Sequence, residues 1–509
     1  MKRLLYILSL LPIGLNAQNM YNVASFLENE LTGTARYVGM GGSMSALGAD
    51  LTTMGTNPAG IAMFRSNDFS FTAGLDIKNN EANYFGTVLK SGKTNAYVGN
   101  SSIVISLNRD GEKLKYLNFG LGYRLKNNLS GVFEMAGASN GWSQQYVIDA
   151  LYKDYEFDYT KVNGQMYEQF VRSWLPMLAA GAEMYDEYGN FISTPDSSLI
   201  WSPDEHAFYE ETRGGVHTAD FNVSANISDR IYLGMTIGAS VVDYNRYTEY
   251  REIDEYGDIY VLENNKYLKG SGFDIKLGAI FRPFKYLPFK VGVSVHTPTW
   301  YSLNEYSSAA MTGPYGMHVA TTDHDIYRDV LSVSSNFNTP WRVNASMAYT
   351  VGSFLAFNAE YEFADYSQTE FTDRGQVYKG QNEEIKCNLK AQHIVRVGAE
   401  LNVKGYALRA GYNYISAPFN KDAYKYLYNS ALYNGTVAET STDYMNHFGK
   451  NIVTLGCGYR SQMFYCDIAY KLEMQQSEFY PFCDFEYINP GASVNSTKHS
   501  LIATVGMRF

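Results

Sequence analysis

Most of the chain after residue 67 alternates hydrophobic and polar residues with a period of two. In residues 69–77 (FSFTAGLDI) every second side chain is hydrophobic, and the side chains between them are small or polar. The same pattern recurs in residues 117–124 (LNFGLGYR) and 231–241 (IYLGMTIGASV). Because successive side chains of a β-strand point to opposite faces, each segment predicts a strand with one apolar face and one polar face.

Similar segments follow along the chain, and the total is about fourteen strands, an even number typical of bacterial outer-membrane barrels. The other segments are 103–107, 221–227, 273–279, 291–295, 343–351, 355–363, 395–403, 406–414, 453–459, 464–468 and 501–509. Short connections such as SDR, VGS and KG alternate with long ones such as 304–332, 370–388, 418–449 and 475–497. Tight turns on one rim and long loops on the other are a feature of these barrels.

The sequence therefore predicts an all-β fold, a transmembrane antiparallel β-barrel over residues 67–509 in the bacterial outer membrane. Its largest connection, residues 129–216, is expected to be an extracellular loop insert. This insert is either an apolar surface that captures a ligand or a loop domain that covers the barrel mouth. A soluble β-sandwich is the less favoured fold, because it has no reason to alternate short and long connections.

The composition argues against several classes of function. Aromatic residues make up 15% of the chain and charged residues only 18%, fewer than the quarter or so that soluble domains carry. The net charge of -11 argues against a nucleic-acid partner. Four scattered cysteines without CxxC spacing predict no metal site. No GxSxG, HExxH or P-loop motif is present, so we expect no catalytic residues and no cofactor.

The chain begins with Lys2 and Arg3, an apolar run over residues 4–15 and a small residue at Ala17. This order is typical of a secretory signal peptide, which we assign to residues 1–17. Residues 18–66 then precede the first expected strand. They are apolar and interrupted by glycines, so they need a protected place in which to lie, and glycines on the inner face of the strands leave room for them.

We therefore expect residues 18–66 to form a hatch, a plug inside the lumen. The Asn57-Pro58-Ala59-Gly60 corner would fold it back, because a residue before proline is disfavoured in helices and glycine permits a reversal. With this corner we group Gly41 and Gly42. As a hypothesis, a ligand contacts the apolar side chains of the segment, which are Met40, Met44, Leu47, Met54, Ile61, Met63 and Phe64.

Residues 35–62 (ARYVGMGGSMSALGADLTTMGTNPAGIA) resemble the hatch of the FadL/TodX family of outer-membrane channels. Residues 396–420 and 357–371 resemble late strands of that barrel. The resemblance implies passive, TonB-independent uptake of a long-chain fatty acid or other hydrophobic small molecule. The ligand would be caught by extracellular loops, held against the hatch and released sideways where an early strand kinks inward.

Other partners and functions stay open. Outer-membrane lipids surround such a barrel, and a last strand that ends in Phe509 resembles the signal presented to the outer-membrane insertion machinery. A heme-binding protein could draw ligands from His206, His318, His324 and His447. A barrel of the same family could instead be a scaffold in protein secretion. Charges expected on the inner face would form either a polar path or salt bridges; they are Arg124, Lys276, Arg342, Glu360, Arg396, Glu400 and Arg409.

Overall fold

The computed structural model describes residues 30–109, 111, 113–154, 160–162, 165–167, 174–182, 184, 203–313, 319–321, 332–373, 376–377, 379–425, 440–483 and 489–509, together with Tyr21. The expected signal peptide, residues 1–17, lies outside the described residues, as do residues 18–20 and 22–29 of the expected hatch.

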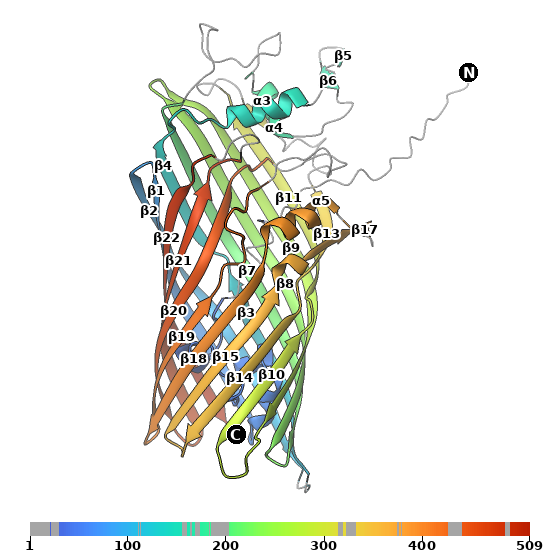
Figure 1. Ribbon diagram of the computed structural model, residues 1–509, viewed down its shortest axis with the longest axis vertical. Helices are drawn as coiled ribbons and strands as arrows, with labels where there is room; N and C mark the ends of the chain where they lie inside the picture. Colours follow the sequence, from blue (N-terminus) through green and yellow to red (C-terminus); the bar gives the residue numbers. More distant parts are fainter. Residues whose placement is uncertain are drawn as a thin grey trace, which may run out of the picture.

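The chain forms a closed barrel of fourteen antiparallel wall strands, which confirms the predicted fold (Figure 1). The ends of the wall meet where β1 pairs with β22, from Asp68 opposite Arg508 to Asn83 opposite Ser493. Some wall strands consist of two numbered segments. The strands are β1 (Asp68–Tyr84), β2 (Thr87–Asn108), β3 (Leu114–Asn128), β4 (Gly131–Ala138), β5 (Thr160–Val162), β6 (Gln165–Tyr167), β7 (Glu205–Ile227), β8 (Ile231–Asp254), β9 (Gly257–Phe281), β10 (Phe289–His296), β11 (Trp300–Thr312), β12 (Val319–Thr321), β13 (Ser332–Asn338), β14 (Arg342–Val351), β15 (Leu355–Asp365), β16 (Glu370–Asp373), β17 (Gln376–Val377), β18 (Ala391–Val403), β19 (Tyr406–Ile415), β20 (Tyr444–Arg460), β21 (Phe464–Tyr480) and β22 (Ala492–Arg508).

Proline explains two of the divided wall strands. Pro298 separates β10 from β11, and Pro340 separates β13 from β14. Proline has no N–H to give to the ladder, so a strand breaks there. The wall stays joined at this level because Thr299 N donates to the Thr339 hydroxyl at 2.8 Å.

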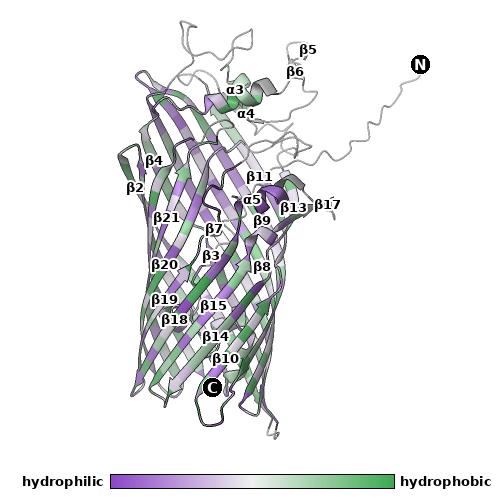
Figure 2. Ribbon diagram, in the orientation of Figure 1, coloured by the Kyte–Doolittle hydropathy of each residue, from purple (hydrophilic) through white to green (hydrophobic). Residues whose placement is uncertain are grey.

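The lower half of the barrel carries an apolar band on its outside (Figure 2). Side chains such as Leu121, Leu408 and Val505 are more than half exposed there. Higher up, outward positions on β9 and β11 become polar, beginning with Ser271 and Ser302. A belt of outward apolar residues between two polar rims is the exterior of a bacterial outer-membrane barrel, which supports the predicted localisation. Within the described residues, no helix has the length and apolar character to span a bilayer.

The strands rise well above this band, further than their sequence pattern indicated. Part of the range 129–216, expected as a loop insert, is wall: β4 pairs with the first half of β7, from Gly131 opposite Thr212 to Ala138 opposite Glu205. Above the membrane the outer face needs no apolar residues, so hydrophobic alternation fades while the strand continues.

Helices α3 (Gln145–Asp154) and α4 (Trp174–Gly181) lie over the upper mouth of the barrel (Figure 1). Their buried side chains, among them Ile148, Leu175 and Leu178, belong to a hydrophobic cluster with Phe133 of β4 and Phe479 of β21. Residues 139–154 and 174–184, with this cluster beneath them, are called the cap below. The described helices of the insert lie over the mouth, and capture of a ligand by this range stays a prediction.

A second apolar cluster lies inside the wall below the cap. It includes Phe337 and Phe371 of the wall and Ile385 of α5 (Lys379–Asn388). The 3-10 helix η4 (Tyr366–Gln368), between β15 and β16, adds Tyr366.

Candidate functional site

Residues 30–66 lie inside the lower half of the barrel, where Figure 1 shows them in blue behind the wall. They form α2 (Ala35–Gly39) and the 3-10 helices η1 (Leu51–Gly55) and η2 (Pro58–Met63). Thr34 caps α2, Asp50 caps η1, and the Thr34 hydroxyl donates to Asp50 Oδ2 at 2.8 Å. These caps satisfy N–H groups that a buried helix start would otherwise leave unpaired. We call residues 30–66 the inner segment; its role as a plug stays a prediction.

Arg36 joins the inner segment to the wall. Its Nε lies 2.8 Å from Glu400 Oε2, and its Nη2 lies 3.0 Å from Glu400 Oε1. Glu400 also accepts from Arg409 Nε at 2.6 Å, and Arg409 Nη1 lies 2.6 Å from Asp467 Oδ1. Charges buried in this way are tolerated because they are paired. The inward charges expected from the sequence all take part in ion pairs.

The Asn57-Pro58-Ala59-Gly60 corner is fully enclosed. Asn57 Oδ1 accepts from Ala59 N at 3.2 Å, and Asn57 Nδ2 donates to Ser45 O at 2.9 Å. Pro58 begins η2, where the missing N–H costs nothing. A Cβ placed on Gly278 of β9 would lie 2.1 Å from Asn57 Oδ1. The corner therefore packs directly on a wall that only glycine leaves open.

Gly41 and Gly42 form the turn after α2, with φ of 65° and 77°. These left-handed values suit glycine and strain other residues. The turn lies against β18 and β19, where a Cβ on Gly411 would come within 2.1 Å of Gly41 N. The inner segment thus meets the wall at two separate places, β9 and the pair β18–β19.

The apolar residues proposed to contact ligand are packed between the inner segment and the wall. Met40, Met44 and Leu47 belong to one buried cluster, and Met54, Ile61 and Phe64 to another. Met63 is partly buried beside Ala59 and Tyr232. None of these seven side chains is part of the lining of the lumen pocket near Lys78 and Phe133, so their contact with a ligand stays a prediction.

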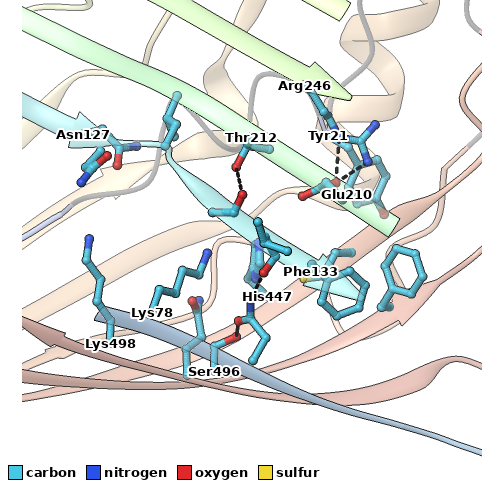
Figure 3. A pocket seen from close by; sticks show the side chains of 18 of the residues that line it. Tyr21, Lys78, Asn127, Phe133, Glu210, Thr212, Arg246, His447, Ser496 and Lys498 are labelled. Carbon is cyan, nitrogen blue, oxygen red and sulfur yellow. Dashed lines mark hydrogen bonds and ion pairs between the residues drawn. The ribbon is translucent and has the colours of Figure 1, made fainter. Parts of the chain in front are cut away.

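The main cavity has a volume of about 210 Å³, and Glu30, the first residue of the inner segment, is among the residues that line it. Figure 3 shows this cavity from close by. Its lining includes side chains from β1, β3, β4, β7, β8, β20, β21 and β22, among them Lys78, Asn127, Phe133, Glu210, Thr212, Arg246, Tyr444, Lys450, Phe479, Ser496 and Lys498. Tyr21 and Phe419, whose rings stack with centroids 5.3 Å apart, add an apolar side. The sequence does not reveal this site, because its lining comes from eight strands, some of which lie far apart in the chain.

One end of the cavity carries lysines with their carboxylate partners, and the other end carries aromatic rings. Lys78 and Lys498 lie together, away from Phe133 (Figure 3). Lys498 pairs with Glu30 and lies 3.0 Å from Asp76 Oδ2. The Phe133 and Phe479 rings are 4.7 Å apart, edge to face. Such a lining suits a molecule with an apolar body and an anionic head.

Beside this cavity the wall has a seam. β2 pairs with β3 only from Asn100 opposite Arg124 to Asn108 opposite Tyr116. Above that level β2 pairs with β1, while β3 and β4 pair with β7. Side chains bridge the interval: Asn95 Nδ2 donates to Asn128 Oδ1 at 3.3 Å, and Asn80 Nδ2 donates to Val132 O at 2.7 Å. Within the described part of the wall, no backbone ladder joins β2 to β3 or β4 over this interval.

A buried polar network holds the cap in place. Glu252 of β8 accepts from the Ser143 hydroxyl at 2.7 Å and from Gln144 N at 2.6 Å, just before α3. Tyr250 and Tyr260 also donate to Glu252. Burial raises the pKa of Glu252 to about 7. His206 of β7 bonds Trp142 O at 2.9 Å, and burial lowers the pKa of His206 to about 4.

The described histidines that could bind heme have different surroundings. Both ring nitrogens of His206 are engaged, Nε2 with Trp142 O and Nδ1 with the Tyr84 hydroxyl. His447 lines the main cavity, and its Nδ1 lies 2.8 Å from the Ser477 hydroxyl. His318 and His324 lie outside the described residues. Among the described residues no group of three or more His, Cys, Asp and Glu side chains is placed to hold a metal ion.

The chain matches no protein-family model, and no curated protein matches its sequence. Its structure resembles that of a Pseudomonas aeruginosa FadL homologue, with a TM-score of 0.54 and 10% identity over 94% of this chain and 99% of the other. It also resembles the P. putida toluene transporter TodX, with a TM-score of 0.55 and 12% identity over 94% and 99%. The resemblance noted in the sequence is thus confirmed at the level of the fold.

Proposed function

We propose that this protein is an outer-membrane channel for passive, TonB-independent uptake of hydrophobic molecules such as long-chain fatty acids. The observation that carries the proposal is the main cavity, which has lysines at one end and aromatic rings at the other and lies against the seam between β2 and β3–β4. The fold shared with the FadL homologue and the toluene transporter TodX supports it.

The inner segment argues against a straight aqueous pore. Its side chains are buried in the lower lumen, and it contacts the wall at Gly278 and at Gly411. A ligand in the main cavity therefore has a shorter way out through the wall than through the lumen. The seam begins above the pair of Asn100 and Arg124, next to Val98, which is exposed on the apolar band, so a molecule that leaves there enters lipid.

The orientation of the ligand follows from the two ends of the cavity. A carboxylate would lie near Lys78 and Lys498, and the apolar chain would lie among Phe133, Tyr444 and Phe479. Charge-assisted bonds to a carboxylate are about twice as strong as neutral ones, which favours an anionic head over a neutral one.

Cross-linking the seam tests the proposal. N95C and N128C are introduced together, with C387S, C457S and C466S to remove the exposed native thiols, and a short thiol-reactive cross-linker that reductant cleaves joins the pair. Proteoliposome uptake of radiolabelled oleate and of toluene should stop when the seam is joined and return with reductant. The matched control joins V241C to S271C, outward neighbours on β8 and β9 that already share a ladder.

Uptake that continues through a joined seam would refute lateral exit. Failure of the uncross-linked protein to take up either compound would refute the channel, and a co-purifying protein in that case would favour the secretion scaffold.

A further inference from the structure

A second, smaller cavity of about 50 Å³ lies lower in the lumen, between the inner segment and the wall. Thr32, Tyr37, Thr52, Gly55 and Thr56 line it from the inner segment. The wall contributes Arg124 and Lys126 of β3, Arg342 of β14, Arg396 of β18, His296 of β10 and Glu362 of β15, so cationic side chains outnumber carboxylates in the lining. This volume holds a few water molecules or one small anion, since a single water needs only some 10–15 Å³ on the same measure.

Several buried polar atoms of the lining make no hydrogen bond among the described residues. They include Arg396 Nε, Arg124 Nε and His296 Nδ1, together with the hydroxyls of Thr32 and Thr56. The side chains of Arg396 and His296 are more than nine-tenths buried. His296 Nε2 lies 2.6 Å from Thr56 O and donates to it, which leaves Nδ1 of the uncharged ring as an acceptor. The unpaired donors are therefore the two guanidinium Nε atoms and the hydroxyls. A buried donor without an acceptor is costly, more so when it is charged, so these donors favour an acceptor in the cavity.

The charges around the cavity do not balance. Five cations, Arg124, Lys126, Lys276, Arg342 and Arg396, stand against four carboxylates, Asp220, Asp274, Glu360 and Glu362. Lys126 has no carboxylate partner among the described residues; its Nζ lies 3.2 Å from the Tyr301 hydroxyl.

Glu30 also lines the cavity, but it belongs to a separate set that is balanced by itself. In that set Lys450, Lys471 and Lys498 face Glu30, Asp76 and Glu473. Counted over the residues that the structure describes, the imbalance at the small cavity is therefore a single positive charge, and an uncompensated buried charge is costly.

We propose that the small cavity is a binding site for one small monovalent anion, a halide or a carboxylate group. The anion accepts from Arg124, Arg396 and the threonine hydroxyls and neutralises Lys126. Because these donors belong to both the inner segment and the wall, the bound anion joins the two. The site does not depend on the proposed transport. The anion is either free in solution or the head of an amphiphile that reaches down past Glu30.

Bromide is the probe, because its anomalous scattering distinguishes it from water. Crystals of the full chain grown in sodium bromide should show an anomalous peak in the small cavity, and the melting temperature should rise in bromide relative to gluconate, which is too large to enter. In Lys126→Gln both the peak and the bromide-specific rise should disappear. Lys269→Gln removes the same charge from the outer face of β9 and should keep both.

Adding dodecanoate distinguishes a free anion from the carboxylate head of an amphiphile. Loss of the bromide peak with carboxylate density in its place would identify an amphiphile head, and an unchanged peak would identify a free anion. A cavity that holds only water in bromide-grown crystals of the native protein would overturn the proposal, as would a peak of equal height in the Lys126→Gln protein.

Discussion

Arg36 and Glu400 are 364 positions apart in the chain, yet Arg36 Nε lies 2.8 Å from Glu400 Oε2. Replacing Arg36 with Met would leave Arg409 alone between the carboxylates of Glu400 and Asp467. Breaking a buried pair costs about 3–5 kcal/mol. We therefore expect R36M to lower the melting temperature and to loosen the inner segment, which would admit small ions in single-channel conductance recordings.

The matched variant for that experiment is R65M. Arg65 lies 3.1 Å from Asp229, but its side chain is 63% exposed. Exposed pairs contribute about 0–1 kcal/mol, so R65M should remain closed and stable. Equal conductance in the two variants would show that the Arg36 pair does not hold the inner segment.

Gly411 allows the closest backbone approach between the wall and the inner segment. A Cβ at this position would lie 2.1 Å from Gly41 N, a backbone atom that cannot rotate away. Gly411→Ala should therefore displace the turn at Gly41 and destabilise the protein by about 1–3 kcal/mol, as overpacking does. Thermal unfolding followed by circular dichroism measures this. In Gly449→Ala the nearest atom is the Tyr414 hydroxyl at 3.1 Å, which can move, so a similar loss there would contradict the steric argument.

The strands were predictable where lipid touches them. Outward positions such as Phe69, Leu233 and Leu501 must be apolar in the membrane, so hydrophobic and polar residues alternate along these parts of the strands. Above the band, outward positions such as Glu211 and Arg213 are polar like their inward neighbours. The upper halves of β7, β8 and β9 were missed for that reason, and β4 was taken for part of a loop.

The candidate site was less predictable than the wall. The Asn57-Pro58 corner and the inward glycines are visible in the sequence, and they contact one another in the structure. The main cavity is not visible, because Lys78, Arg246 and Lys498 come together only when the barrel closes. The alternation along each strand indicates that Lys78 and Lys498 point into the barrel. It does not tell which strands face one another across the lumen.

The cap should respond to pH through two buried groups with opposite effects. The pKa of Glu252 is raised to about 7, so its contribution to holding the cap is complete below its ordinary value of 4.5 and is lost as pH rises towards 7. The pKa of His206 is lowered to about 4, so its contribution is complete above 6.5 and is lost as pH falls towards 4. Between pH 4.5 and 6.5 the two changes oppose each other.

E252Q separates the two effects, because glutamine keeps the shape of the side chain and does not titrate. Hydrogen exchange of the α3 amides, corrected for the intrinsic rate, should change little in the native protein over this range. In E252Q protection should increase with pH by at most about tenfold per unit, since one pKa unit corresponds to about 1.4 kcal/mol. Identical pH profiles for the two proteins would mean that Glu252 does not hold the cap.

Phe509 closes the barrel with its backbone while its ring faces outward. Its N–H donates to Asn67 O at 3.2 Å, it accepts from Asn67 N at 3.1 Å, and the residue is 55% exposed. Because the ring contributes little to packing, F509A should fold to a barrel of normal melting temperature. If the ring is instead read by the insertion machinery, the amount of assembled protein in the outer membrane should fall several-fold. F464A is the control, since Phe464 at the start of β21 is 58% exposed near the same rim. Heat-modifiable mobility on gels measures the assembled fraction, and an equal fraction in the two variants would rule out a special role for the terminal ring.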